Sequence, residues 1–134
     1  TALVEGICEV GQQLIGLMTT EDDRIYDLYN RYTSAIATNL CFNCHLEDMS
    51  PEDAKSALMK ETGVSRSIAD QKLGFIMHPV WCTSFPHYWY GRELIRKVYL
   101  DGLMAPEEIL RTIYSEPHTV RTFCAKLKLD ANLL

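Results

Sequence analysis

Apolar residues recur at helical spacing along most of the chain, and no window alternates as a β-strand would. The first apolar stripe predicts a helix over about residues 2–18, and its members are Leu3, Ile7, Val10, Leu14 and Leu17. A longer stripe predicts a second helix that runs to about residue 45, and its members are Ile25, Leu28, Tyr29, Tyr32, Ile36 and Leu40. We therefore expect an all-α protein.

The third helix has the clearest boundaries. Ser50-Pro51-Glu52-Asp53 combines an N-cap, a first-turn proline and an acidic first turn, and Gly63 suits the left-handed residue that ends many helices. A fourth helix is expected to start at Ser65 or Ser67. It should end at His78, because a residue that precedes proline avoids helical geometry.

Three further helices complete the predicted fold. The first is rich in aromatic residues and should run from about Pro86 to Leu100, with Ser84 as its cap and Asp101-Gly102 as its stop. Two short helices should open at Pro106 and Pro117. The pattern predicts a compact bundle of about seven helices.

Size and charge narrow the range of functions. The 134 residues suit a single domain over residues 1–134. Acidic residues outnumber basic ones by 18 to 13, which argues against nucleic acid or an anionic membrane surface as a partner. The apolar runs are too short to span a bilayer. Five cysteines, an odd number, do not suggest a secreted disulfide scaffold, so we expect a cytoplasmic protein.

The beginning of the sequence suggests a fragment. The chain starts at Thr1 and is apolar by its third residue, within the first predicted helix. We expect the 134 residues to be the C-terminal part of a longer protein.

The aromatic turn before residue 91 is the first candidate site. His87, Tyr88, Trp89 and Tyr90 are consecutive at a predicted helix start, where they offer an imidazole, two phenols and an indole. Such a cluster can line a binding site. Alternatively, the aromatic rings cover the core and turn their polar tips to water.

A second candidate site is Cys41-Phe42-Asn43-Cys44-His45, which matches the C-x-x-C-H pattern of c-type haem attachment. The same residues could bind zinc together with Cys82 or His87, or they could simply pack at a helix end. His78, His87 and His118 are candidate acid–base groups, but no nucleophile with an orienting partner accompanies them.

Glu5 is the third candidate. Gly6 follows it inside a predicted helix, where glycine costs about 1 kcal/mol of helix stability, so another element should pack closely there. A carboxylate on such a helix can serve as the third ligand of a zinc site whose histidines lie on a preceding helix.

Several segments together resemble helical zinc peptidases. Phe85-Pro86-His87-Tyr88-Trp89-Tyr90-Gly91-Arg92-Glu93-Leu94 resembles the Phe-Pro-Thr-Tyr-x-Leu-Gly-x-Leu segment of thermostable Taq-type metallocarboxypeptidases. It is also similar to the Ser-Tyr-x-x-Gly-x-Leu segment of a bacterial family of zinc-peptidase-like proteins of unknown function. Glu5-Gly6-Ile7-Cys8 and Met49-Ser50-Pro51-Glu52-Asp53-Ala54 resemble that family's Glu-Gly-Trp-Ala and Met-Thr-x-Glu-Glu-Ala segments. The order of the segments supports one alignment over roughly residues 4–100.

The resemblance implies a gluzincin, in which two histidines of an H-E-x-x-H motif and a downstream glutamate hold zinc. It would make Glu5 the third zinc ligand and Tyr88 the donor to the oxyanion formed during peptide hydrolysis, with His87 and Tyr90 beside the peptide substrate. The sequence has no H-E-x-x-H motif. The isolated chain should therefore be inactive and bind no zinc, and the rest of the parent chain would supply the histidines.

Two other functions stay open from the sequence. A non-catalytic helical module could bind a partner through the aromatic turn, without any dependence on metal. A haem or thiol redox protein could use Cys41, Cys44 and His45.

Overall fold

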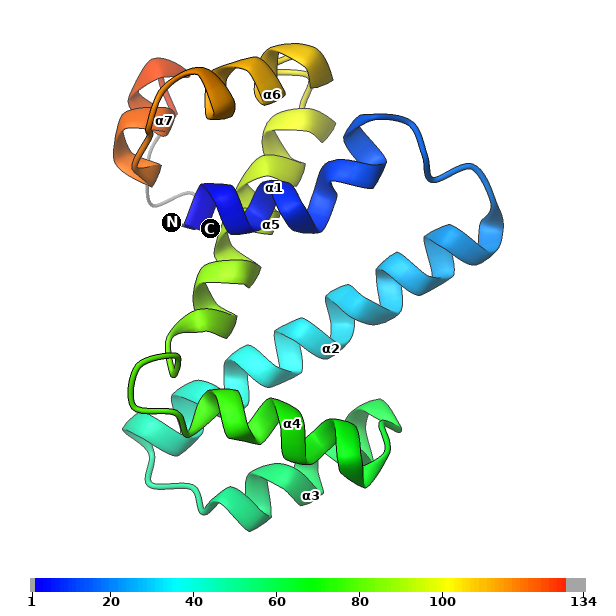
Figure 1. The fold of residues 1–134 in the computed structure, drawn as a ribbon, viewed down its shortest axis with the longest axis vertical. Coiled ribbons are helices and arrows are strands. Elements are labelled where there is room, and N and C mark those ends of the chain that lie inside the picture. Colours follow the sequence, from blue (N-terminus) through cyan, green and yellow to red (C-terminus); the bar gives the residue numbers. More distant parts are fainter. Residues whose placement is uncertain (1, 130–134) are drawn as a thin grey trace. The chain divides into compact units, whose positions relative to one another are not determined.

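The computed structural model describes residues 2–129, and within this range it contains seven α-helices and no β-strand (Figure 1). The predicted all-α class and the number of helices are confirmed. The helices are α1 (Ala2–Leu14), α2 (Glu21–Leu46), α3 (Pro51–Thr62), α4 (Arg66–Ile76), α5 (Ser84–Leu100), α6 (Pro106–Ser115) and α7 (Val120–Lys126). Among the described residues, no helix combines the length and the apolar character needed to cross a membrane.

The helices form two compact units. The first unit contains the described residues up to Thr20 and those from His87 onward. The second unit contains Glu21 to Pro86, so the first turn of α5 belongs to it.

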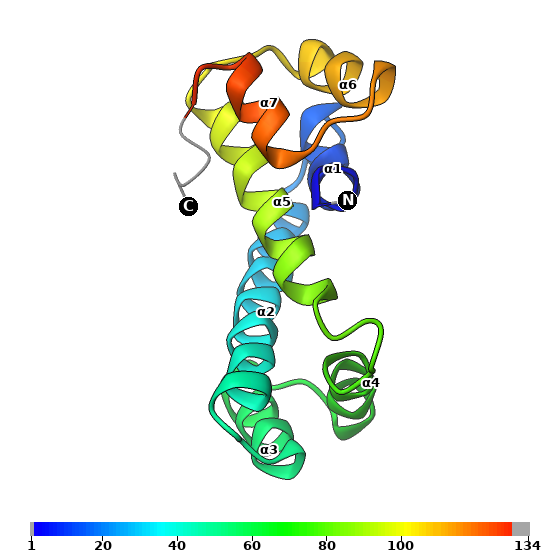
Figure 2. The same ribbon diagram turned by 90° about the vertical axis from the view of Figure 1, so that its left-hand side faces the viewer.

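In the first unit, α1 crosses α5, and α6 and α7 follow the C-terminal end of α5 (Figures 1 and 2). Apolar residues of all four helices, together with Met104 from the loop before α6, share one core. Its buried members are Leu3, Ile7, Val10, Leu14, Leu94, Ile95, Val98, Met104, Ile109, Ile113, Phe123 and Cys124. The stripes predicted for the first and the aromatic helix therefore point into this core.

In the second unit, the C-terminal half of α2 packs with α3 and α4 (Figure 2). The core here consists of Leu40, Cys41, Ala54, Leu58, Val64, Ala69, Leu73 and Ile76. The phenol groups of Tyr29 and Tyr32 donate to the carbonyl oxygens of Thr62 and Glu61, at 3.1 and 3.2 Å. They thereby supply partners for carbonyls at the C-terminal end of α3.

The boundaries predicted from capping residues are confirmed for both ends of α3 and for the start of α4. The Ser50 hydroxyl accepts a bond from the Asp53 amide, Pro51 is the first helical residue, and Gly63 has a φ of 71°. Ser65, one of the two serines predicted to start the fourth helix, is the N-cap of α4.

Four predicted helix boundaries are wrong by a few residues. α1 ends at Leu14, because Gly16 adopts a φ of +75° that breaks the helix, and Leu17 beyond it is 62% exposed. α4 ends at Ile76, before His78. α5 begins at Ser84, which is therefore its first residue and not its cap.

The fourth correction concerns α7, which begins at Val120 and not at Pro117. The side chains of Thr119 and Thr122 each accept a bond from the other's main-chain amide in a capping box. This pair fixes the helix start three residues after the proline.

The apolar stripe predicted for α2 is only partly buried. Ile25 and Leu28 in its first half are each 57% exposed, whereas Leu40 in its second half is 5% exposed. Only the second half of the stripe reaches the core that α2 shares with α3 and α4.

Candidate functional site

α1 and α5 meet at two glycines, Gly6 and Gly91. A Cβ atom built on Gly91 would lie 3.2 Å from the Gly6 Cα atom and would collide with the Ala2 carbonyl. A Cβ atom on Gly6 would lie 2.7 Å from the Arg92 amide nitrogen and closer still to the Gly91 carbonyl group. Only hydrogen fits at either position. The close packing predicted at Gly6 is thus confirmed, and its partner is the glycine of the aromatic helix.

This crossing brings Glu5 close to Tyr88. Tyr88 lies one turn before Gly91 on α5, and Glu5 immediately precedes Gly6 on α1. The pKa of the Tyr88 phenol is raised, mainly by burial and further by electrostatic interaction with Glu5, Glu9 and Cys8. These side chains of α1 are therefore electrostatic neighbours of the phenol, which stays protonated and able to donate a hydrogen bond at neutral pH.

Two arginines of α5 fix the crossing. Arg92 is only 1% exposed, and its Nη1 lies 3.2 Å from Oε2 of Glu9. One turn further along, Arg96 Nη1 donates to Oε1 of Gln13 at 2.8 Å. Neither pair was predicted from the sequence, because an arginine in an amphipathic helix ordinarily faces solvent. The position of Arg92 directly after Gly91 was the only signal of this burial.

The other two residues predicted for this site, His87 and Tyr90, have different surroundings. His87 is exposed. Tyr90 packs against the core of the first unit, and its phenol pKa is raised by burial and by the Cys124 thiol. Tyr90 therefore has its closest electrostatic neighbour on α7, whereas Tyr88 has its neighbours on α1.

The C-x-x-C-H segment lies at the end of α2, where it contacts the connection between α4 and α5. The thiol of Cys41 donates to the Cys82 carbonyl oxygen at 2.8 Å, and Nε2 of His45 lies 2.7 Å from the Ile76 carbonyl oxygen. Burial raises the pKa values of both Cys41 and Cys44. Two side chains of the motif thus bond main-chain oxygens of another segment.

Nowhere between residues 2 and 129 do three histidine, cysteine or acidic side chains converge in a way that could hold a metal ion. Glu5 is half-buried at the α1–α5 crossing and offers a carboxylate oxygen, which suits zinc. Glu5 could therefore serve as one ligand of a zinc site, and the remaining ligands would have to come from another segment.

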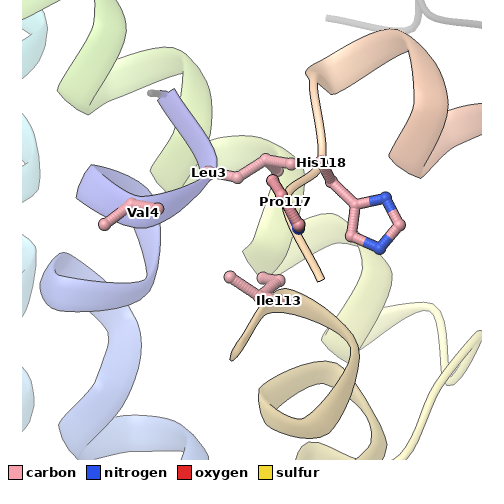
Figure 3. A pocket seen from close by; sticks show the side chains of 5 residues that line it. All are labelled: Leu3, Val4, Ile113, Pro117 and His118. Carbon is pink, nitrogen blue, oxygen red and sulfur yellow. The ribbon is translucent and has the colours of Figure 1, made fainter. Parts of the chain in front are cut away.

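A cavity of about 160 Å³ lies elsewhere in the first unit, between α1 and the α6–α7 connection (Figure 3). Leu3, Val4, Ile113, Pro117 and His118 line it. Figure 3 shows the His118 ring on the far side of Pro117 from the three aliphatic side chains. Nε2 of His118 instead lies 3.3 Å from Oε1 of Glu116. The cavity is therefore lined mainly by apolar side chains, and its one titratable lining residue, His118, is paired with Glu116.

His78, another candidate acid–base group, orders the loop between α4 and α5. Its Nδ1 accepts bonds from the Val80 and Trp81 amides at 3.1 and 3.3 Å, and its ring packs against the Trp81 indole. The lone pair on Nδ1 of His78 is therefore used to hold the loop in its conformation.

Comparison with models of protein families, with curated proteins and with solved structures gives no match for this chain.

Proposed function

We propose that these residues form the C-terminal part of a zinc metallopeptidase-like protein that hydrolyses peptide bonds. In this proposal Glu5 is the third zinc ligand and Tyr88 donates to the oxyanion, while His87 and Tyr90 contact the peptide. The parent chain supplies two histidines and a general base from an H-E-x-x-H helix, and it acts in the cytoplasm on a peptide substrate. The 134-residue chain alone is inactive.

The observation that carries this proposal is the contact between the two segments on which the resemblance rests. The Glu-Gly segment and the Tyr-x-x-Gly segment are more than 80 residues apart in the sequence, yet their glycines pack against each other. The contact leaves Glu5 near enough to Tyr88 to contribute to the raised pKa of its phenol. A zinc ligand and an oxyanion donor must lie on either side of the same substrate carbonyl, so this proximity is what the proposed chemistry requires.

Each residue of the proposed site has a separate role in peptide hydrolysis. Zinc, when bound, would polarise the substrate carbonyl and lower the pKa of its water. Tyr88 would donate its phenolic proton in a hydrogen bond to the oxygen on which negative charge develops. Arg92 and Glu9 would hold the two helices in register and so set the distance between Glu5 and the phenol.

The test uses the full-length parent protein. Tyr88→Phe should lower kcat by about 10²–10³-fold with an unchanged zinc content, since this is the usual cost of losing one oxyanion donor. Glu5→Gln should reduce the amount of zinc retained per chain. Tyr114→Phe is the matched control, because Tyr114 is 67% exposed and lies on α6. Retention of activity within about twofold in Tyr88→Phe would refute the assigned role, given the size of this typical loss.

A second candidate is a non-catalytic module that binds a partner. Val80 and Trp81 are 68% and 54% exposed in the loop directly before the aromatic turn, and the bonds to His78 hold that loop in place. An exposed indole on an ordered loop suits protein recognition. This function predicts that partner binding by the parent protein is insensitive to a metal chelator and is lost in Trp81→Ala.

A further inference from the structure

The end of α2 and the loop before α5 bring three cysteines together in the second unit. Cys41 and Cys44 are one turn apart on α2, and Cys82 lies in the loop. The hydrogen bond of 2.8 Å from the Cys41 sulfur to the Cys82 carbonyl oxygen places this thiol directly against the main chain of Cys82. All three are free thiols in this structure.

We propose that Cys41 and Cys82 are a redox-active pair that closes into a disulfide when the protein meets a small-molecule disulfide such as oxidised glutathione. This site is independent of the proposed peptidase chemistry. The Cys41 sulfur already touches the main chain of the residue to which it would be joined, and a disulfide requires two cysteines whose backbones lie this near to each other.

The reaction has two exchange steps. The half-buried Cys82 loses its proton to solvent, and its thiolate attacks one sulfur of oxidised glutathione. This step forms a mixed disulfide and releases one glutathione thiolate. The Cys41 thiolate, whose proton also goes to solvent, then attacks the Cys82 sulfur of the mixed disulfide and releases the second glutathione. Two protein thiols are oxidised, and one glutathione disulfide is reduced to two thiols.

The surroundings of Cys41 determine how fast the second step proceeds. Burial raises the pKa of its thiol, and the neighbouring Cys82 and Cys44 sulfurs raise it further. The fraction of reactive thiolate at neutral pH is therefore small, and the closing step should accelerate as the pH is raised toward 9.

Closure would join the end of α2 to the loop that leads into the aromatic turn. The resulting ring contains α3 and α4 and spans residues 41–82. Cross-links over a loop of this length restrict the unfolded chain considerably, so the oxidised protein should unfold at a Tm about 10 °C higher than the reduced protein.

The experiment is performed on the 134-residue chain under native conditions. The protein is incubated with oxidised glutathione, free thiols are blocked with an alkylating reagent, and tryptic peptides are analysed by mass spectrometry. Cleavage separates residues 32–55, which carry Cys41 and Cys44, from residues 73–92, which carry Cys82. We expect a linked pair of these peptides, with fragmentation that assigns the bond to Cys41, and a rise in Tm.

Four variants make the result decisive. Cys82→Ser should abolish both the link and the rise in Tm, yet it should keep the fold because Cys82 contributes its main-chain oxygen to the hydrogen bond. Cys44→Ser and Cys8→Ser should retain both effects. If the link forms only after the protein is denatured, or if it persists through Cys44 in Cys41→Ala, the assignment of the pair is overturned.

Discussion

The contact between Gly6 and Gly91 leads to the sharpest prediction about this fold. In Gly6→Ala, the new methyl group would lie 2.7 Å from the Arg92 amide nitrogen and closer to the Gly91 carbonyl group. Its neighbours are main-chain atoms of a helix, which cannot rotate away as a side chain can. The two helices must therefore move apart, and the bond of 3.2 Å between Arg92 and Glu9 must lengthen with them.

The magnitude follows from two opposing effects. Alanine in place of glycine within a helix stabilises it by about 0.5–1 kcal/mol. Forcing an extra methyl group into a packed interface typically costs about 1–3 kcal/mol, and the rigid neighbours here put the substitution at the upper end. We expect Gly6→Ala to lower the free energy of unfolding by about 2 kcal/mol.

Gly11→Ala provides the matched control. Gly11 lies on the same helix, and a Cβ atom built on it meets nothing within 4 Å outside the helix itself. Only the helix propensity then changes, so this variant should gain up to about 1 kcal/mol. The two substitutions are chemically identical, but they should change the free energy of unfolding in opposite directions.

The assay is urea unfolding followed by far-ultraviolet circular dichroism, with the free energy of unfolding obtained by linear extrapolation. Gly91→Ala should be at least as destabilising as Gly6→Ala, because its methyl group would collide with the Ala2 carbonyl. If Gly6→Ala were as stable as the parent chain or gained stability like Gly11→Ala, the close approach of α1 and α5 would be refuted.

Two further predictions concern a helix cap and a half-buried phenol. Ser50→Ala removes the side-chain acceptor at the start of α3 and should lower the free energy of unfolding by about 1 kcal/mol, whereas Ser56→Ala, at an exposed position inside the same helix, should not lower it. Urea titrations of both variants distinguish these outcomes. The pKa of Tyr90 is raised above the usual 10.0 by burial and by the Cys124 thiol, so the protonated phenol favours the folded state. This contribution is complete below pH 10 and declines as the pH rises through the folded-state pKa, so the parent chain should lose stability more steeply above pH 10 than Tyr90→Phe does. Tyr114→Phe should behave like the parent chain in the same pH series, and equal slopes for all three proteins would contradict the assignment.

Much of this fold was predictable because helix ends and apolar faces are local properties. Ser50, Ser65 and Gly63 act on residues within one turn of themselves, so short stretches of sequence suffice to locate these boundaries. The buried stripes of α1 and α5 were visible for the same reason. The start of α7 was misplaced because two local signals compete there, and the Thr119–Thr122 capping box sets the start rather than the preceding proline.

Burial of individual side chains was less predictable, because it depends on which helix lies opposite. Ile25 and Leu40 occupy the same stripe of α2, yet only Leu40 reaches the core shared with α3 and α4. Arg92 shows the reverse case, since its charge is buried against α1 and paired with Glu9. Such pairings are not encoded in the spacing within one helix.

The candidate site contains residues that the sequence could indicate and a helix contact that only the structure reveals. Glu5 and Tyr88 were each predicted from segments with weak individual signals, but glycine at position 6 carried independent physical information, since a helix interior tolerates it at a cost of about 1 kcal/mol. That cost is explained by Gly91, which belongs to the second segment of the same resemblance. Gly6 is needed for the close packing of α1 against α5, so its replacement should act on catalysis through the position of the helices. Under the proposed function, Gly6→Ala should therefore weaken peptide hydrolysis by the parent protein, because the separation of α1 from α5 would move Glu5 away from Tyr88.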